Sequence, residues 1–216
     1  MSFTAASSAP RARSVPTILG QTMFLVAAAL GLCALGSVLG RDLSFGAARF
    51  CSFAGLGMLL AQSFVKPLRY GALGIGWLAA LAVLIGFGLG PTIAYFADVD
   101  PAALTTAVSL TALTVLGMAA VGFTMSKDTV RWMRPLSYIV LGAVVISLGS
   151  IIFGGLGSLS PIISIVILVV SALLILVDFN YIRKHGTEND TIWLATGIFV
   201  SIVNIFVSLL NIFSGR

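Results

Sequence analysis

The stretch PIISIVILVVSALLILVDFNY, Pro161–Tyr181, decides the class of fold. As a helix it is ~30 Å long, which is enough to cross the hydrocarbon core of a bilayer. One acidic residue, Asp178, lies inside the stretch near its end. A carboxylate at membrane depth is costly unless it faces protein or water, so Asp178 is the first candidate functional residue. The alternative is a structural carboxylate at the helix end, close to Arg183 and the membrane boundary.

The composition of the whole chain agrees with this reading. Hydrophobic residues make up 59% of the chain and charged residues only 9%, and the mean hydropathy is +1.12. Soluble domains carry about 25% charged residues, so we expect an all-α membrane protein with the lipid bilayer around it. The net charge of +5 comes from residues at segment ends, and this pattern predicts no nucleic-acid binding.

Seven apolar segments are each long enough to cross the membrane as a helix. Residues 18–213 are therefore expected to form one seven-helix transmembrane domain. Residues 1–17 are rich in Ser and Ala and are expected to form a disordered cytoplasmic tail. The third segment is expected to bend or end near GFGLGP, Gly86–Pro91. The segments are Ile18–Leu39, Phe45–Phe64, Tyr70–Ala97, Ala102–Thr124, Pro135–Phe153, Pro161–Tyr181 and Thr191–Phe213.

Lysine and arginine are distributed unequally between the two ends of these segments. Nine of them flank alternate segment ends, and only Arg41 and Arg216 flank the others. Arg49, early in the second segment, is expected to extend to the outer interface. Because cytoplasmic loops carry the excess of cations, we expect the N-terminus inside and the C-terminus outside. The nine are Arg11, Arg13, Lys66, Arg69, Lys127, Arg131, Arg134, Arg183 and Lys184.

Several kinds of chemistry have no residues to support them. Cys33 and Cys51 are isolated in separate segments, and His185 is the only histidine. We expect no enzyme activity, no cofactor and no metal centre, with Asp178 the one candidate for a calcium role. Gly86 and Gly90 have the GxxxG spacing that favours close packing of membrane helices.

The last part of the chain resembles the Bax inhibitor-1 family, also called the transmembrane Bax-inhibitor-motif family. The resemblance lies in an acidic residue at the inner end of the sixth segment, a short polar loop, and a last helix ending in NIFVSLL, Asn204–Leu210. GFGLGPTIAYF, Gly86–Phe96, resembles the end of the family's third helix. The NIFVSLL run and the pair Lys66–Pro67 resemble the proteobacterial branch, which includes a modulator of the FtsH-type membrane protease.

The resemblance implies a fold in which six helices surround a central seventh. It also implies a mechanism: in calcium-leak members two aspartates share a proton, and an arginine of the second helix latches onto them. Asp178 corresponds to the first aspartate, but Ser201 stands where the second is expected, so the acid pair is broken here. Lys66 and Arg69 are the cations of the latch region, and Ser201 and Asn204 are the expected hydrogen-bond donors. A pair between Asp178 and one of these cations would either switch the protein or hold the seventh helix in place.

Three functions remain open at this stage. The first is a multi-pass protein of the bacterial inner membrane that binds and modulates an FtsH-type protease, with residues 1–16 as the engaging segment. The second is a pH-sensitive leak channel or transporter for calcium, protons or another cation, which uses Asp178. The third is a purely structural membrane protein.

Overall fold

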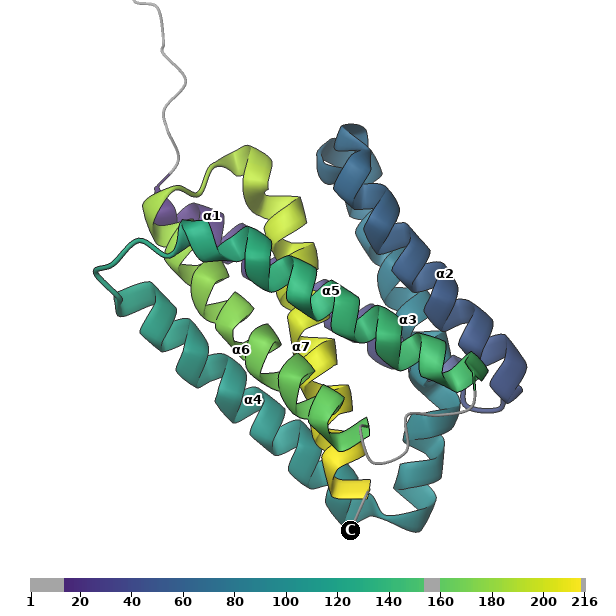
Figure 1. The fold of residues 1–216 in the computed structure, drawn as a ribbon. Helices are drawn as coiled ribbons and strands as arrows, with labels where there is room; N and C mark the ends of the chain where they lie inside the picture. Colours follow the sequence, from purple (N-terminus) through teal and green to yellow (C-terminus); the bar gives the residue numbers. More distant parts are fainter. Residues whose placement is uncertain (1–13, 154–159, 215–216) are drawn as a thin grey trace, which may run out of the picture.

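Seven α-helices make up almost all of the residues that this computed structural model describes, 14–153 and 160–214, and no strand occurs among them (Figure 1). The helices are α1 (Val15–Leu39), α2 (Phe45–Phe64), α3 (Gly71–Val99), α4 (Pro101–Thr124), α5 (Val130–Phe153), α6 (Ser160–Lys184) and α7 (Thr191–Ser214). Two short 3-10 turns, η1 (Lys66–Arg69) and η3 (Glu188–Asp190), precede α3 and α7.

Local sequence explains where several helices begin. The side chain of Ser44 accepts a hydrogen bond from the backbone N–H of Ala47 (3.3 Å) and caps α2. Asp100 does the same for α4, where its Oδ1 accepts from the N–H of Ala103 at 2.9 Å. Such side-chain acceptors satisfy backbone donors that have no partner in the first helical turn.

The observed helices agree with the predicted segments to within two residues except at the starts of α1 and α5 and at the end of α6, which extends to Lys184 rather than Tyr181. α3 continues through Gly86–Pro91 to Val99, within two residues of the predicted bound at Ala97, so the alternative in which the helix ends at Gly86–Pro91 is wrong. Membrane helices tolerate an internal proline because neighbouring groups satisfy the freed backbone carbonyl. α5 begins at Val130 rather than Pro135. α1 begins at Val15, so residues 15–17 are helical, and the rest of the predicted tail, residues 1–13, lies outside the described residues.

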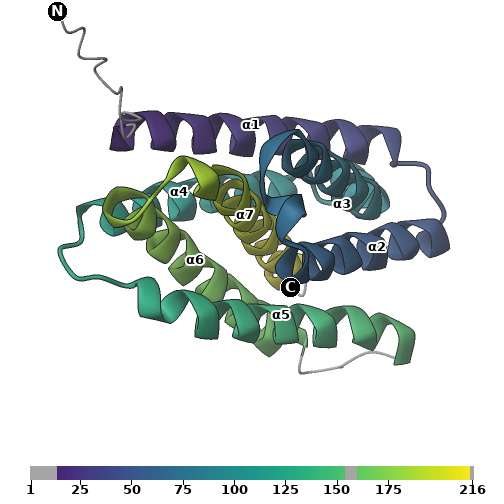
Figure 2. The same cartoon turned by 90° about the horizontal axis from the view of Figure 1, so that it is seen from above.

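The C-terminal helix lies inside the bundle. α7 packs against α1, α3, α4 and α6, and the view from above shows it surrounded by the other helices (Figure 2). α2 packs mainly on α3, and α5 packs on α6. The outer helices therefore do not cover α7 equally, since neither α2 nor α5 makes an extensive interface with it.

Six of the seven helices are long and apolar enough to cross a membrane, namely all except α2. α2 carries Arg49 and Gln62, which make it less apolar than its neighbours. It nevertheless runs alongside α3 through the bundle (Figure 1). A helix of 20 residues is ~30 Å long, so the length of α2 matches the thickness of the hydrocarbon core of a bilayer.

Glycines bring α1 and α3 into close contact, as the GxxxG spacing predicts. A Cβ built at Gly86 would lie 2.3 Å from the carbonyl oxygen of Cys33, and one at Gly90 would lie 2.6 Å from that of Gly40. These backbones approach more closely than any side chain allows.

Candidate functional site

Asp178 lies in the interior, on the part of α6 that faces α7. The residue is 4% exposed, and its Oδ2 is 3.6 Å from the position that a Cβ would take at Gly197 of α7. Among the described residues, no hydrogen bond or ion pair reaches the carboxylate. The candidate residue is therefore a buried acid that packs against a glycine.

The two cations of the predicted latch lie elsewhere. Arg69 donates from Nε to the carbonyl oxygen of Gln62 at 2.7 Å, and its Nη2 donates to the carbonyl oxygen of Ser63. These carbonyls belong to the last turn of α2, where no intrahelical donor remains, so Arg69 of η1 caps the end of α2. Lys66 is exposed in η1. The structure does not bring either side chain into an ion pair with Asp178, because local backbone acceptors engage the guanidinium and Lys66 points to solvent.

Gln62, rather than either cation, joins the end of α2 to another helix, and that helix is α7 instead of the predicted α6. Its side chain is buried, and Nε2 donates to the Leu68 carbonyl oxygen at 3.2 Å and to Thr196 Oγ1 at 3.3 Å. Sequence reasoning missed this residue. A neutral amide in an otherwise apolar helix was the available indication.

Ser201 and Asn204 lie on the α7 face that contains Gly197. They follow Gly197 by four and seven residues, a spacing that keeps side chains on one helical face. Ser201 is buried and Asn204 is half-buried. Within the described part of the chain, neither of these two side chains donates a hydrogen bond to the Asp178 carboxylate.

Asn180, two residues after Asp178, holds the end of α4 and was not identified from the sequence. It is fully buried, and its Oδ1 accepts from the N–H and Oγ1 of Thr129, both at 3.1 Å. Its Nδ2 donates to the carbonyl oxygens of Gly122 and Met125, both at 3.1 Å. One amide thus satisfies four polar groups at the turn between α4 and α5, which is the pattern expected of a structural residue.

Cations from the end of α6 support the same turn. Arg183 donates to the Met125 carbonyl oxygen at 2.5 Å, and Lys184 donates to that of Ser126. Beyond them, His185 Nε2 and Asp128 Oδ2 are 2.6 Å apart at the surface. A backbone hydrogen bond from Val130, followed by the contact with His185, lowers the pKa of Asp128 from its ordinary value of 3.8. We call this set (Asn180, Arg183, Lys184, His185 and the turn 125–129) the α4–α6 clamp.

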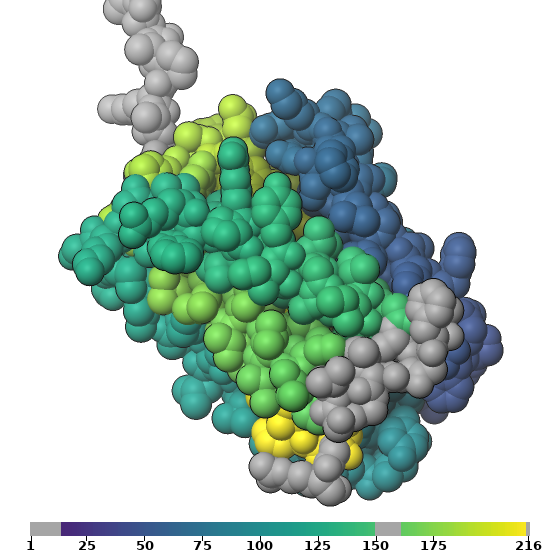
Figure 3. All heavy atoms as spheres, in the orientation of Figure 1, coloured from purple at the N-terminus to yellow at the C-terminus, as the bar shows by residue number. Residues whose placement is uncertain are grey.

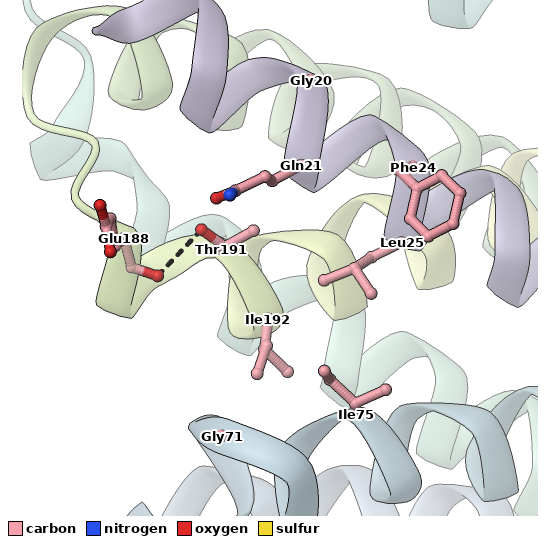
Figure 4. Close-up of a pocket in the computed structure, with 9 residues that line it drawn as sticks. All are labelled: Gly20, Gln21, Phe24, Leu25, Gly71, Ile75, Glu188, Thr191 and Ile192. Carbon is pink, nitrogen blue, oxygen red and sulfur yellow. Dashed lines mark hydrogen bonds between the residues drawn. The ribbon is translucent and has the colours of Figure 1, made fainter. Parts of the chain in front are cut away.

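A groove lies at the other side of this end of the bundle, between α1, α3 and the start of α7. It has a volume of about 690 Å³, and Figure 4 shows Gln21 and Thr191 at its polar end and Leu25, Ile75 and Ile192 along its apolar part. Asp178 is not among its lining residues. The space-filling view in Figure 3 shows α5 covering much of the opposite side of the bundle.

The donor set for a metal ion is sparse. Within the described ranges, no group of three or more His, Cys, Asp and Glu side chains is placed to hold a metal ion. Asp178 in particular faces Gly197 of α7, and no second carboxylate is described beside it.

Comparison with known proteins gives one match. The sequence model of the family described as "Inhibitor of apoptosis-promoting Bax1" matches residues 15–216, which is nearly the whole chain. No curated protein matches the sequence.

Proposed function

The chain belongs to the Bax inhibitor-1 family, and from this premise we propose that it is a bacterial inner-membrane protein that binds and modulates an FtsH-type protease. The NIFVSLL run at Asn204–Leu210 and the pair Lys66–Pro67 support this branch of the family. Membership itself, together with six apolar helices, makes the chain a multi-pass membrane protein.

One observation carries the choice of a protein-binding role over ion conduction. The carboxylate of Asp178 faces Gly197, and Ser201 occupies the position expected for a second acid. Two close carboxylates share a proton because both cannot remain charged, and a single carboxylate cannot do this. The chain therefore lacks the acid pair on which the calcium-leak mechanism of the family depends.

The α4–α6 clamp supports the same proposal. It fixes the turn 125–129 at the end of the bundle that carries most of the cations, since Asn180, Arg183 and Lys184 all bind its backbone. A fixed surface of this kind suits recognition by a partner, because little conformational entropy is lost on binding.

Removal of the N-terminal segment tests the role of the tail. Residues 2–13 are the segment to delete, because Ser14 and Val15 begin α1. We expect the truncated protein to insert and fold normally but to lose co-purification with, and turnover by, the protease. A matched control replaces residues 2–13 with a Gly/Ser segment of equal length, which separates sequence from length. Undiminished co-purification and turnover after deletion would refute the tail as the engaging segment.

A cation leak through Asp178 is the second candidate function. The observation in its favour is that a buried carboxylate without a partner is costly and is usually kept for a function. The measurement is the flux of calcium and of protons through purified protein in liposomes, compared with Asp178→Asn. Flux that disappears in a folded Asp178→Asn variant would replace the protease proposal.

The proposed topology has seven crossings, with the N-terminus in the cytoplasm and the C-terminus outside. The alternation of the helices supports it, since η1 with Lys66 and Arg69, the turn that contains Lys127, and the end of α6 at Lys184 lie at the same end of the bundle as the start of α1 (Figure 1). Single cysteines at Arg69 and Asp100, in a chain without Cys33 and Cys51, should be labelled from opposite sides by an impermeant reagent. Labelling of both from one side would exclude a crossing of α3.

A further inference from the structure

Ser171 is a buried hydroxyl whose hydrogen bonds are not made. It is 0% exposed, and its Oγ has no partner in the structure. Buried hydroxyls in membrane helices commonly donate to the carbonyl four residues earlier, as Thr22 and Thr111 do here at 2.9 and 2.7 Å. The Ser171 hydroxyl does not make this hydrogen bond. A buried polar atom without a partner indicates an internal water or a functional role.

Ser171 belongs to a row of polar side chains on α6. Ser164, Ser171 and Asp178 are spaced by seven residues, which is close to two helical turns and keeps them on one face. All three are buried. The unsatisfied hydroxyl and the carboxylate therefore point from the same side of the helix.

A second row lies on the face of α7 that contains Gly197. Gly197, Ser201, Asn204 and Ser208 follow one another at intervals of four, three and four residues and share a face. Gly197 lies opposite Asp178, and the two helices are antiparallel. Ser171 precedes Asp178 by seven residues, and Asn204 follows Gly197 by seven. Because the helices are antiparallel, Ser171 and Asn204 lie at the same depth in the bundle, ~10 Å along the helix axes from the carboxylate. We call the two rows together the α6–α7 polar column.

The column extends from Asp178 in one direction only. Towards the nearer end of α6 the next inward side chains are Ile182 and, on α7, Leu194, and both are fully buried. Towards the far end the hydroxyls and the amide continue. Absence of a side chain at Gly197 leaves space beside the carboxylate, whose Oδ2 is 3.6 Å from the vacant Cβ position.

We propose that the α6–α7 polar column holds internal water, anchored by Ser171, through which Asp178 exchanges its proton with the side of the membrane where α6 begins. An internal water needs two to four polar partners. Ser171, Ser201, Asn204 and Asp178 supply them at successive depths. The step is a simple transfer: the carboxylate takes up a proton from the nearest water and returns it by the same route.

No other charged side chain competes for this proton. Arg183, on the same helix, binds the Met125 carbonyl oxygen of the α4 turn. Gln62, which reaches α7 from α2, is neutral and donates to Thr196. Among the described residues, neither α1, α4, α5 nor α7 presents a charge to Asp178. The inference concerns solvent exchange inside the bundle and is independent of the protease proposal.

Hydrogen–deuterium exchange of the Asp178 carboxyl group tests the proposal. The C=O infrared band of the protonated carboxyl, assigned by its loss in Asp178→Asn, shifts when the proton is replaced by deuterium from D₂O. In the full-length protein we expect exchange without unfolding. In Ser171→Ala we expect the exchange rate to be about tenfold lower, since the loss of one hydrogen bond along the route raises the barrier enough to slow exchange by that factor. Ser171→Thr restores a hydroxyl and should restore the rate.

Ser137→Ala is the matched control. Ser137 is an exposed serine of α5 that donates to the Met133 carbonyl oxygen, so its removal should leave the exchange rate unchanged. Unfolding midpoints measured in parallel identify any variant that has merely loosened. Equal exchange rates in wild type and Ser171→Ala overturn the proposal. The proposal is also overturned if Ser171→Thr does not restore the rate, or if the band exchanges only on unfolding. Absence of the band at every pH at which the protein is folded overturns it as well.

Discussion

Gly86→Ala is the substitution whose effect the structure defines most sharply. The added Cβ would meet the Cys33 carbonyl oxygen at 2.3 Å, and the Gly36 Cα and Ser37 N at 3.0 Å each. All three are backbone atoms of α1, so no side-chain rotation can relieve the contact. α1 and α3 must move apart along their interface.

The size of the effect follows from these distances. Ordinary van der Waals contact begins at 3.4 Å, so the helices must separate by about 1 Å, and side chains packed along the interface lose contact. Overpacking of this kind costs about 1–3 kcal/mol. Replacement of a helical glycine by alanine returns about 0.5–1 kcal/mol. We expect a net destabilisation of about 1–2 kcal/mol.

The assay is thermal unfolding of the purified protein in mild detergent, followed by loss of helical circular dichroism. For a chain of this size the expected loss lowers the midpoint by about 3–6 °C. Gly76→Ala is the matched control, because it lies in the same helix and a Cβ there meets nothing within 4 Å. Its midpoint should be unchanged or slightly higher.

Equal midpoints for Gly86→Ala and Gly76→Ala would refute the reasoning, because both carry the same gain in helix propensity and only the first carries the clash. A destabilised Gly76→Ala would refute it as well.

Three further outcomes are expected. Asn180→Ala should lower the unfolding free energy by about 2–4 kcal/mol, measured in the same assay, because it removes the donor to the buried Gly122 carbonyl oxygen and the acceptor of the Thr129 N–H and hydroxyl. A change below about 0.5 kcal/mol would show that these groups find other partners. Asp178→Asn should leave the midpoint unchanged or raise it, since no cation among the described residues loses a partner, and a marked loss of stability would reveal an ion pair after all. The pKa of Asp128 in the folded protein lies below 3.8, so the contribution of this carboxylate to stability is present above about pH 4 and is lost as the pH falls through the folded-state pKa. The difference in unfolding free energy between wild type and Asp128→Asn should therefore shrink on acidification. A constant difference from pH 6 to 3 would contradict this.

The sequence by itself determined the class of the protein and nearly every helix. Hydropathy is a local property, and the thickness of the bilayer dictates the length of an apolar segment, so α1, α2, α3, α4, α6 and α7 could be located within a few residues. The distribution of lysine and arginine indicated which loops share an end for the same reason, since it depends only on the order of segments. Asp178 was identified because one carboxylate is conspicuous in Pro161–Tyr181.

Only the tertiary structure decided which side chains meet. In a soluble helix the polar face marks what points outward, whereas a membrane helix is apolar on both its lipid-facing and its protein-facing sides. α6 is of this kind, so its sequence does not show that Asp178 faces Gly197 or that Asn180 faces α4. Arg69 was assigned to Asp178 from its charge, but the carbonyls of α2 lie nearer and need a donor. Register and rotation of packed helices, which depend on contacts between distant segments, chose these partners.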